Sequence, residues 1–184
     1  MSATAPTRMT ADEFIAWAME QPEGKRYELM AGQVIAMAPE RAGHGRVKGA
    51  TFAALREAIR AGGLSCEAYV DSMSVRVDST TVYEPDVLVR CGPRLDIQAI
   101  EVSDPLIIVE VISPSSRRLD TGIKLEDYFR IQSVRHYLVI KVETRSIVHY
   151  QRDESGAIIT NVVRNGALHL DPPGIVIADL FTDL

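Results

Sequence analysis

The sequence is poor in cysteine, which excludes some classes of protein. Its 184 residues include only Cys66 and Cys91, whose spacing fits neither a zinc site nor a disulfide framework. Small secreted domains that depend on disulfides are therefore excluded. Sparse cysteine is typical of proteins in a reducing compartment, so we expect a cytoplasmic protein.

Long apolar runs and an excess of positive charge are also missing. No apolar run approaches the roughly 20 residues that span a bilayer, and the opening MSATAPTR lacks the apolar core of a signal peptide. We therefore expect no membrane association, a disordered tail over residues 1–8 and a single domain over residues 9–184. The net charge of −5 argues against broad, non-specific binding to nucleic acid but leaves room for a local basic patch.

The apolar pattern that is present predicts a mixed α/β domain. Thr10 and Glu13 form a capping box that begins a helix at about Ala11. A second helix is expected from about His44, and a third ends at about Gln132. The predicted strands cover residues 26–30, 33–37, 73–77, 82–90, 106–112, 136–141 and 147–151. This order predicts a central mixed β-sheet flanked by helices, with β-hairpins and a C-terminal antiparallel meander.

Glu110 stands in the most apolar stretch of the chain. Its run, Leu106 to Ile112, is bounded by prolines and is typical of a strand buried on both faces. A carboxylate costs several kcal/mol to bury unless something pairs with it. We therefore expect a metal ion or a cation near Glu110, or an open end of the sheet. The alternative to a functional site is an internal salt bridge.

A second acid and a lysine complete the candidate site. Asp86 follows Pro85 on the preceding predicted strand, and carboxylates from adjacent strands are ligands that suit Mg²⁺ or Mn²⁺. Lys124 stands four residues from both Asp120 and Tyr128, which places the three on one helix face. A lysine there can stabilise charge on a phosphate or help to deprotonate an attacking water. Taken singly, Asp86 could end a turn and Lys124 could be solvated.

Together these motifs resemble the Uma2 family, also called DUF820, of restriction-endonuclease-like proteins in the PD-(D/E)XK nuclease superfamily. The resemblance covers nearly the whole chain. MTADEFIAW is similar to the family's opening helix and RYELMAGQVIAMAP to its hairpin. EPDVLV carries the Pro-Asp signature, and VRHYLVI is similar to the strand after the last helix. PLIIVEVISPSS, followed by Asp120, Lys124 and Tyr128, is the most specific part.

The resemblance implies a restriction-endonuclease-like core with a metal site. Asp86 and Glu110 would be the ligands, joined by the backbone carbonyl of Val111, and Mg²⁺ would be the cofactor, with Mn²⁺ able to substitute. The superfamily motif places a lysine two positions after the second acid, where this chain has Ile112. Lys124 is expected to supply that group from the following helix instead.

Two residues nearer the N-terminus are further candidates. Glu28 occupies the family's glutamate position and is expected at the rim of the site, the alternative being a hairpin salt bridge with Arg26 or Lys25. His44 begins a helix as the family's histidine does. It could contact a phosphate or transfer a proton, since histidine titrates near neutral pH, or simply be a residue at a helix start.

The segment around the third helix offers candidate substrate-binding residues. Arg117 and Arg118 could bind a phosphate backbone, although an exposed arginine pair is usually just solvated. Tyr128 is expected to line the same cleft as Lys124 or to pack at the edge of the core.

Three functions compete at this point. The first is a Mg²⁺-dependent endonuclease that hydrolyses DNA phosphodiester bonds by in-line attack of water, with Lys124 as charge stabiliser, in a homodimer. The second is a non-catalytic binding or assembly module that keeps the nuclease fold. The third is hydrolysis of a different phosphate ester. The acidic net charge weakens the DNA hypothesis, and the Asp86, Glu110 and Lys124 set weakens the non-catalytic one.

Overall fold

The computed structural model describes residues 8–112 and 118–181, and for residues 118–121 it describes the backbone alone. The helices are α1 (Ala11–Met19), α2 (Ala42–Ala61) and α3 (Arg118–Arg130). The strands are β1 (Tyr27–Met30), β2 (Gln33–Ala36), β3 (Cys66–Val70), β4 (Val75–Asp78), β5 (Thr81–Tyr83), β6 (Val87–Cys91), β7 (Pro105–Ile112), β8 (His136–Lys141), β9 (Ser146–Arg152), β10 (Ile158–Val163), β11 (Leu168–Leu170) and β12 (Ile175–Ile177). The tail expected over residues 1–8 lies outside the described residues except for Arg8.

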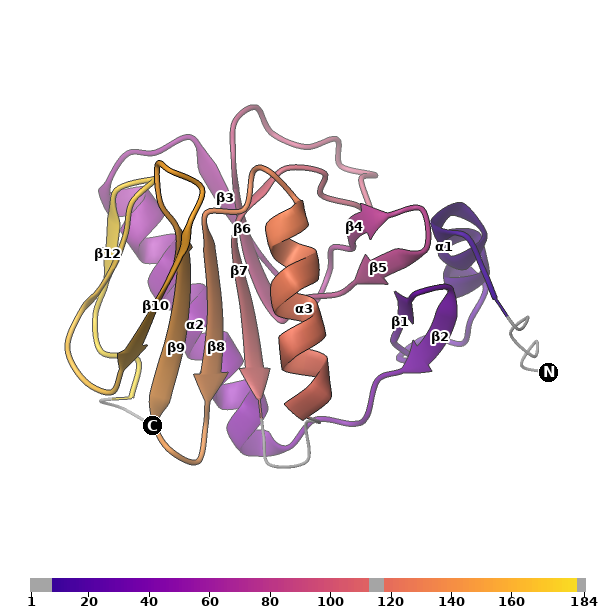
Figure 1. Cartoon of the computed structure of the whole chain (residues 1–184), viewed down its shortest axis with the longest axis horizontal. Coiled ribbons are helices and arrows are strands. Elements are labelled where there is room, and N and C mark those ends of the chain that lie inside the picture. The colour runs from indigo at the N-terminus through magenta and orange to yellow at the C-terminus, as the bar shows by residue number, and fades with distance from the viewer. Residues whose placement is uncertain (1–7, 113–117, 182–184) are drawn as a thin grey trace.

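A mixed six-stranded sheet forms the centre of the molecule, as predicted. Its strand order is β10-β9-β8-β7-β6-β3. β7 lies between β6, which is antiparallel to it, and β8, which is parallel. Parallel neighbours need a crossover connection, and α3 supplies it (Figure 1). β8, β9 and β10 follow as the predicted antiparallel meander, whereas β11 and β12 form a separate hairpin beside α2.

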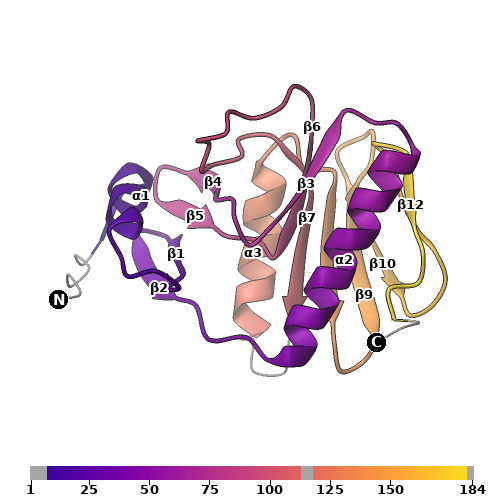
Figure 2. The ribbon, with the colours of Figure 1, turned by 180° about the vertical axis from the view of Figure 1, so that it is seen from behind.

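The two longer helices cover opposite faces of this sheet. Because side chains alternate along β7, Val109 packs with Val47 and Leu55 of α2, and Ile108 packs with Tyr128 of α3. Figure 2 shows α2 crossing the back of the sheet, and Figure 1 shows α3 in front of it. The strand predicted at residues 106–112 is thus buried on both faces.

The N-terminal part forms a second, smaller layer. Its sheet has the order β2-β1-β5-β4, and α1 packs on it through Phe14, which lies in one buried cluster with Leu29. The predicted capping box is present, since Thr10 Oγ1 accepts a hydrogen bond from the Glu13 N–H while the Glu13 carboxylate accepts one from the Thr10 N–H. Gly32 has φ of 81° in the turn of the predicted hairpin, a value that glycine adopts without strain.

The strand predicted over residues 82–90 is wrong as a single element. The chain leaves the small sheet after β5 and enters the central sheet as β6, and Glu84, Pro85 and Asp86 form the connection. Pro85 has no N–H to give to a strand ladder, which favours the break. β3, which the sequence pattern did not predict, then pairs with β6 and forms one edge of the central sheet.

The expectation that the cysteines form no disulfide is also wrong for this structure. Cys66 of β3 lies directly opposite Cys91 of β6, and the two sulfurs are bonded. The sequence separation of 25 residues carried no sign of this pairing, because the register between β3 and β6 creates it. None of the helices within the described residues has both the length and the apolar character that crossing a bilayer requires.

Candidate functional site

Glu110 is held on the α3 side of the central sheet. Its neighbours Val109 and Val111 pack toward α2, so its own side chain points to the opposite face. Its Oε1 accepts hydrogen bonds from Lys124 Nζ at 2.9 Å and from the Tyr128 hydroxyl at 2.8 Å. Both groups reach one carboxylate because they stand one helical turn apart. The internal salt bridge that the sequence left open as an alternative is therefore present.

Glu28 joins the same group across a long sequence separation. Lys124 Nζ lies 2.8 Å from Glu28 Oε1, which also accepts the backbone N–H of Glu84 at 3.1 Å. Within the described residues, Arg26 does not pair with Glu28 but binds Glu84 at 2.9 Å. The structure thus places Glu28 beside Glu110, with one ammonium between the two carboxylates.

Asp86 lies just before β6 and next to Glu110. Val87 pairs with Val109 in the β6–β7 ladder, so the preceding Asp86 reaches the level of Glu110. The Val111 N–H donates to Asp86 Oδ2 at 2.6 Å, which fixes the carboxylate at the end of β7. That Asp86 and Glu110 share one metal ion, with the Val111 carbonyl as a further ligand, stays a prediction.

The other oxygen of Asp86 faces α2 and a second group of side chains. His44 Nε2 lies 3.2 Å from Asp86 Oδ1 and 3.8 Å from Glu40 Oε1. One ligand atom from each of Glu40, His44 and Asp86 lies within 4.8 Å of the others, an arrangement that could hold a metal ion. Glu40 was missed in the sequence because it precedes α2 in an irregular segment, where no periodicity marks it.

Lys48 occupies the centre of this second group. Its Nζ lies 2.5 Å from Glu40 Oε1, 2.6 Å from Asp71 Oδ2 and 3.5 Å from Asp86 Oδ1. The sequence held one signal for it, since Lys48 stands four residues after His44 and so shares its helix face. Nothing in the sequence pattern marked Asp71, which comes directly after β3 and has φ of 50°.

Burial and charge change the acidities of the two buried acids in opposite directions. Burial, together with the charges of Glu28 and Asp86, outweighs the opposing charge of Lys124 and raises the pKa of Glu110 to about 7. Burial also acts to raise the pKa of Asp86, but His44, the Val111 N–H and Lys48 outweigh it, so this pKa is lowered. Asp86 is therefore the ionised acid of the site, whereas Glu110 titrates near neutral pH.

The basic groups remain positively charged in these surroundings. Burial acts to lower the pKa of Lys124, but the carboxylates of Glu110 and Glu28 outweigh it and raise the pKa. The pKa of Lys48 is raised against burial by Asp71, Glu40 and Asp86. A protonated ammonium can stabilise negative charge but cannot accept a proton, so Lys124 is suited to the first of the two roles expected for it.

Of the remaining residues that the sequence predicted for the site, the structure describes the side chain of only one. Tyr128 is fully buried and binds Glu110, so it buttresses the site from within the core. Arg117 lies outside the described residues. Arg118 is the first residue of α3, and its side chain and that of Asp120 also lie outside the description. Their expected phosphate and cleft contacts stay predictions.

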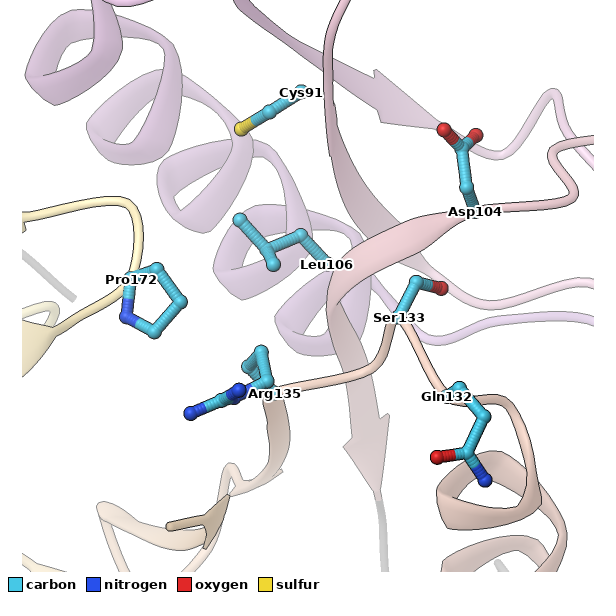
Figure 3. Close-up of a pocket in the computed structure, with 7 residues that line it drawn as sticks. All are labelled: Cys91, Asp104, Leu106, Gln132, Ser133, Arg135 and Pro172. Atoms are coloured by element: carbon cyan, nitrogen blue, oxygen red, sulfur yellow. The ribbon is translucent and has the colours of Figure 1, made fainter. Parts of the chain in front are cut away.

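A surface pocket of about 330 Å³ lies at the other end of β7 (Figure 3). It is lined by Cys91, Asp104, Leu106, Gln132, Ser133, Arg135 and Pro172. Asp104 binds Arg90 at 2.7 Å, and the Ser133 hydroxyl donates to the Pro105 carbonyl at 2.8 Å. None of the predicted site residues lines it, so this pocket is separate from the buried acids.

The fold places the protein in the mixed α/β class, and the sequence comparison assigns its family. The chain belongs to the Uma2 family, whose description is "Putative restriction endonuclease" and whose model matches residues 11–177. The chain is also similar to a crystal structure described as a putative nuclease belonging to DUF820 from Anabaena variabilis. That match has a TM-score of 0.75 and 16% identity, covers 95% of this chain and 98% of the other, and shows a shared fold.

Two proteins of Synechocystis sp. are similar over most of their length. One, Uncharacterized protein slr1290, is 26% identical over 180 residues, which cover 96% of this chain and 93% of the relative. The other, Uncharacterized protein sll1609, is 29% identical over 157 residues, covering 83% of this chain and 86% of the relative. Neither name states an activity.

Proposed function

We propose that the protein is a metal-dependent endonuclease that hydrolyses DNA phosphodiester bonds. One observation carries the proposal: in a chain of a restriction-endonuclease family, the Asp86 carboxylate accepts the N–H of Val111, the residue that directly follows Glu110 at the end of the central strand. Both carboxylates are buried, at 4% and 9% relative exposure, where unpaired charges are costly. Such an arrangement is more typical of a site than of a surface ion pair.

The charge balance of the site fits a bound divalent cation. Ion pairs join the cations Arg26, Lys48 and Lys124 to six carboxylates, those of Glu28, Glu40, Asp71, Glu84, Asp86 and Glu110. The carboxylates are in excess even when the histidine is protonated. Without a further cation this excess would repel a DNA phosphate, because like charges in a partly buried site are poorly screened.

The proposed ligands are Asp86, Glu110 and the carbonyl of Val111, with Glu40 and His44 able to complete the set on the α2 side. Carboxylate and carbonyl oxygens are ligands that suit both Mg²⁺ and Mn²⁺. When bound, such an ion supplies Lewis-acid stabilisation of the charge that develops on a phosphoryl oxygen.

The chain's own residues have distinct parts in the proposed site. Lys124 neutralises Glu110 and Glu28 and contributes positive charge beside the phosphate. In the metal-free protein, Asp86 holds His44 through Nε2 and raises the pKa of His44 against the effect of burial, so that the imidazole keeps its proton to a higher pH. Arg117 and Arg118 are proposed to bind the DNA backbone outside the buried acids.

A plasmid cleavage assay tests the proposal. Supercoiled and single-stranded DNA are incubated with wild type and with Asp86→Asn in Mg²⁺, Mn²⁺ or EDTA. Cleavage by wild type should depend on the metal and fall about 10²–10³-fold in Asp86→Asn, the size expected for loss of one charged group of a site. Asp96→Asn, an exposed aspartate in the β6–β7 connection, is the matched control and should retain wild-type cleavage.

A non-catalytic binding module is the second candidate, and one observation favours it. Lys48 and Lys124 already neutralise part of the acidic group in the absence of metal. If neither DNA is cleaved in any metal, while wild type and Asp86→Asn bind DNA equally well, the endonuclease proposal is wrong. The binding module would then be the better description.

A further inference from the structure

Strand β10 is an open edge of the central sheet. It pairs with β9 on one side only and ends the strand order of the sheet. Its sequence, IITNVV, contains neither proline nor a charged residue. All residues from Ile158 to Val162 are exposed, and Ile158, Ile159 and Val162 are among the most exposed large apolar side chains, at 40, 47 and 61%.

Such an edge is unusual in a protein that stays alone in solution. An edge strand offers a row of unpaired N–H and C=O groups, and natural proteins usually protect it with lysine, proline, bulges or a covering element. β10 has none of the first three: its register with β9 runs without a shift over all six pairs. Its exposure shows that no described element covers it either. The opposite edge differs, because β3 carries the charged Glu67 and packs against α2.

The side chains of β10 make it complementary to itself. Ile158, Thr160 and Val162 lie on one face, since they alternate with Ile159 and Asn161. In a two-fold antiparallel pair centred on Thr160, the two Thr160 residues lie opposite each other, and each Ile158 lies opposite Val162 of the other copy. Pairs of threonines and of β-branched apolar residues are favourable cross-strand pairs, each worth roughly 0.2–1 kcal/mol.

The charges that flank β10 favour the same antiparallel arrangement. Glu154 lies in the turn before the strand and Arg164 directly after it, and both are exposed. Neither makes an ion pair within the part of the chain that the structure describes. Antiparallel pairing brings Arg164 of each copy to the end of the interface where the Glu154 turn of the other copy lies. A parallel arrangement would instead place like charges together.

We propose that a second copy of this chain pairs with β10, so that two central sheets join into one continuous antiparallel sheet across Thr160. The inference goes beyond the proposed nuclease activity and does not rest on it, because none of the proposed site residues lies on β10. The proposal commits to one register and to a symmetric interface, which a single contact at the two-fold axis can test.

Disulfide trapping at Thr160 tests the register. Cys66 and Cys91 are bonded to each other and the chain has no free cysteine, so Thr160→Cys introduces the one free thiol. Under mild oxidation, most of the variant should become a covalent dimer on a non-reducing gel. Val176→Cys is the control, because Val176 is also an exposed strand residue, at 49%, but lies on β12. Crosslinking of Thr160→Cys no faster than that of the control would overturn the proposal.

Sedimentation analysis of lysine variants tests the interface without a covalent bond. Wild type should sediment as a dimer, and Val162→Lys should weaken dimerisation at least tenfold, because each added charge would lie against Ile158 of the other copy. Val176→Lys should dimerise like wild type. Circular dichroism melting of Val162→Lys should match wild type at concentrations where both are monomeric, which separates loss of pairing from loss of folding. A monomeric wild type at 100 µM, or a dimer unaffected by Val162→Lys, contradicts the proposal.

Discussion

The site contains two buried lysines that both pair with carboxylates, but the carboxylates around them differ in exposure to solvent. Lys124 lies between Glu28 and Glu110 on the α3 side, and all three side chains are buried. Lys48 lies among Glu40, Asp71 and Asp86 on the α2 side, where the side chains of Glu40 and Asp71 remain 30 and 34% exposed. Hereafter we call these the Lys124 group and the Lys48 group.

Because the two groups differ in exposure, we expect them to have different roles in the protein. Water cannot easily solvate the carboxylates of the Lys124 group, so their ammonium is needed for folding. Water, and therefore a hydrated cation, can reach the Lys48 group from its Glu40 and Asp71 side. We expect the Lys124 group to set stability and the Lys48 group to respond to metal. Asp86 and the Val111 peptide connect the two.

The largest expected effect is the loss of stability when each ammonium is removed. Lys124→Met should lower the free energy of unfolding by about 3–5 kcal/mol, because it leaves two buried carboxylates without the cation that pairs with them. Lys48→Met should cost no more than about 1–2 kcal/mol, since Glu40 and Asp71 can turn to water. Urea unfolding followed by circular dichroism measures both, and equal losses would remove the distinction between the groups.

A somewhat smaller effect concerns pH in the metal-free protein. The folded-state pKa of Glu110 is about 7, above its ordinary value of 4.5, so the folded state binds the extra proton between these values. The contribution of Glu110 to the free energy of unfolding is therefore present below about pH 4.5 and is lost as the pH rises toward 7. The loss is roughly 3 kcal/mol at most. In EDTA, Glu110→Gln should flatten this part of the stability profile relative to wild type.

The Lys48 group should not share that dependence. The pKa of Asp86 is lowered, so its contribution is present above its ordinary value of 3.8 and is lost only as the pH falls below it. Glu126→Gln, which removes an exposed carboxylate of α3, is the control for Glu110→Gln and should keep the wild-type profile. An unchanged profile in Glu110→Gln would show that another group titrates in this range.

The smallest expected effect is stabilisation by Mn²⁺. A ligand that binds only the folded state adds about 2.7 kcal/mol at a concentration of 100 times its Kd. The melting temperature of wild type should rise with Mn²⁺, and Asp86→Asn should lose the rise. Lys48→Met should bind Mn²⁺ more tightly by titration calorimetry, because no ammonium competes for Glu40 and Asp86.

An exposed lysine provides the control for the competition between Lys48 and Mn²⁺. Lys25→Met, in the connection between α1 and β1, should bind Mn²⁺ like wild type. Weaker Mn²⁺ binding in Lys48→Met than in wild type would mean that Lys48 supports the metal site rather than competing for it.

Local sequence signals predicted most of the fold. The apolar run around Glu110 predicted the central strand, and the Thr10–Glu13 capping box predicted the start of α1, because each depends on residues close in the chain. β3 escaped prediction, since none of its residues is fully buried and its pairing with β6 comes from the tertiary fold. The passage of the chain from the small sheet to the central sheet at Pro85 was likewise visible in the sequence only as a proline within a predicted strand.

For the site, the sequence by itself determined the identity of a buried acid, a second acid after Pro85 and a helical lysine with a tyrosine one turn later. Their spacing follows from strand alternation and the helical repeat, which are local. Only the tertiary structure decided that Lys124 also pairs with Glu28, that Glu40 joins His44 and Asp86, and that Cys66 meets Cys91. These contacts join segments far apart in the chain, and their geometry depends on strand register and on how α2 and α3 pack on opposite faces of one sheet.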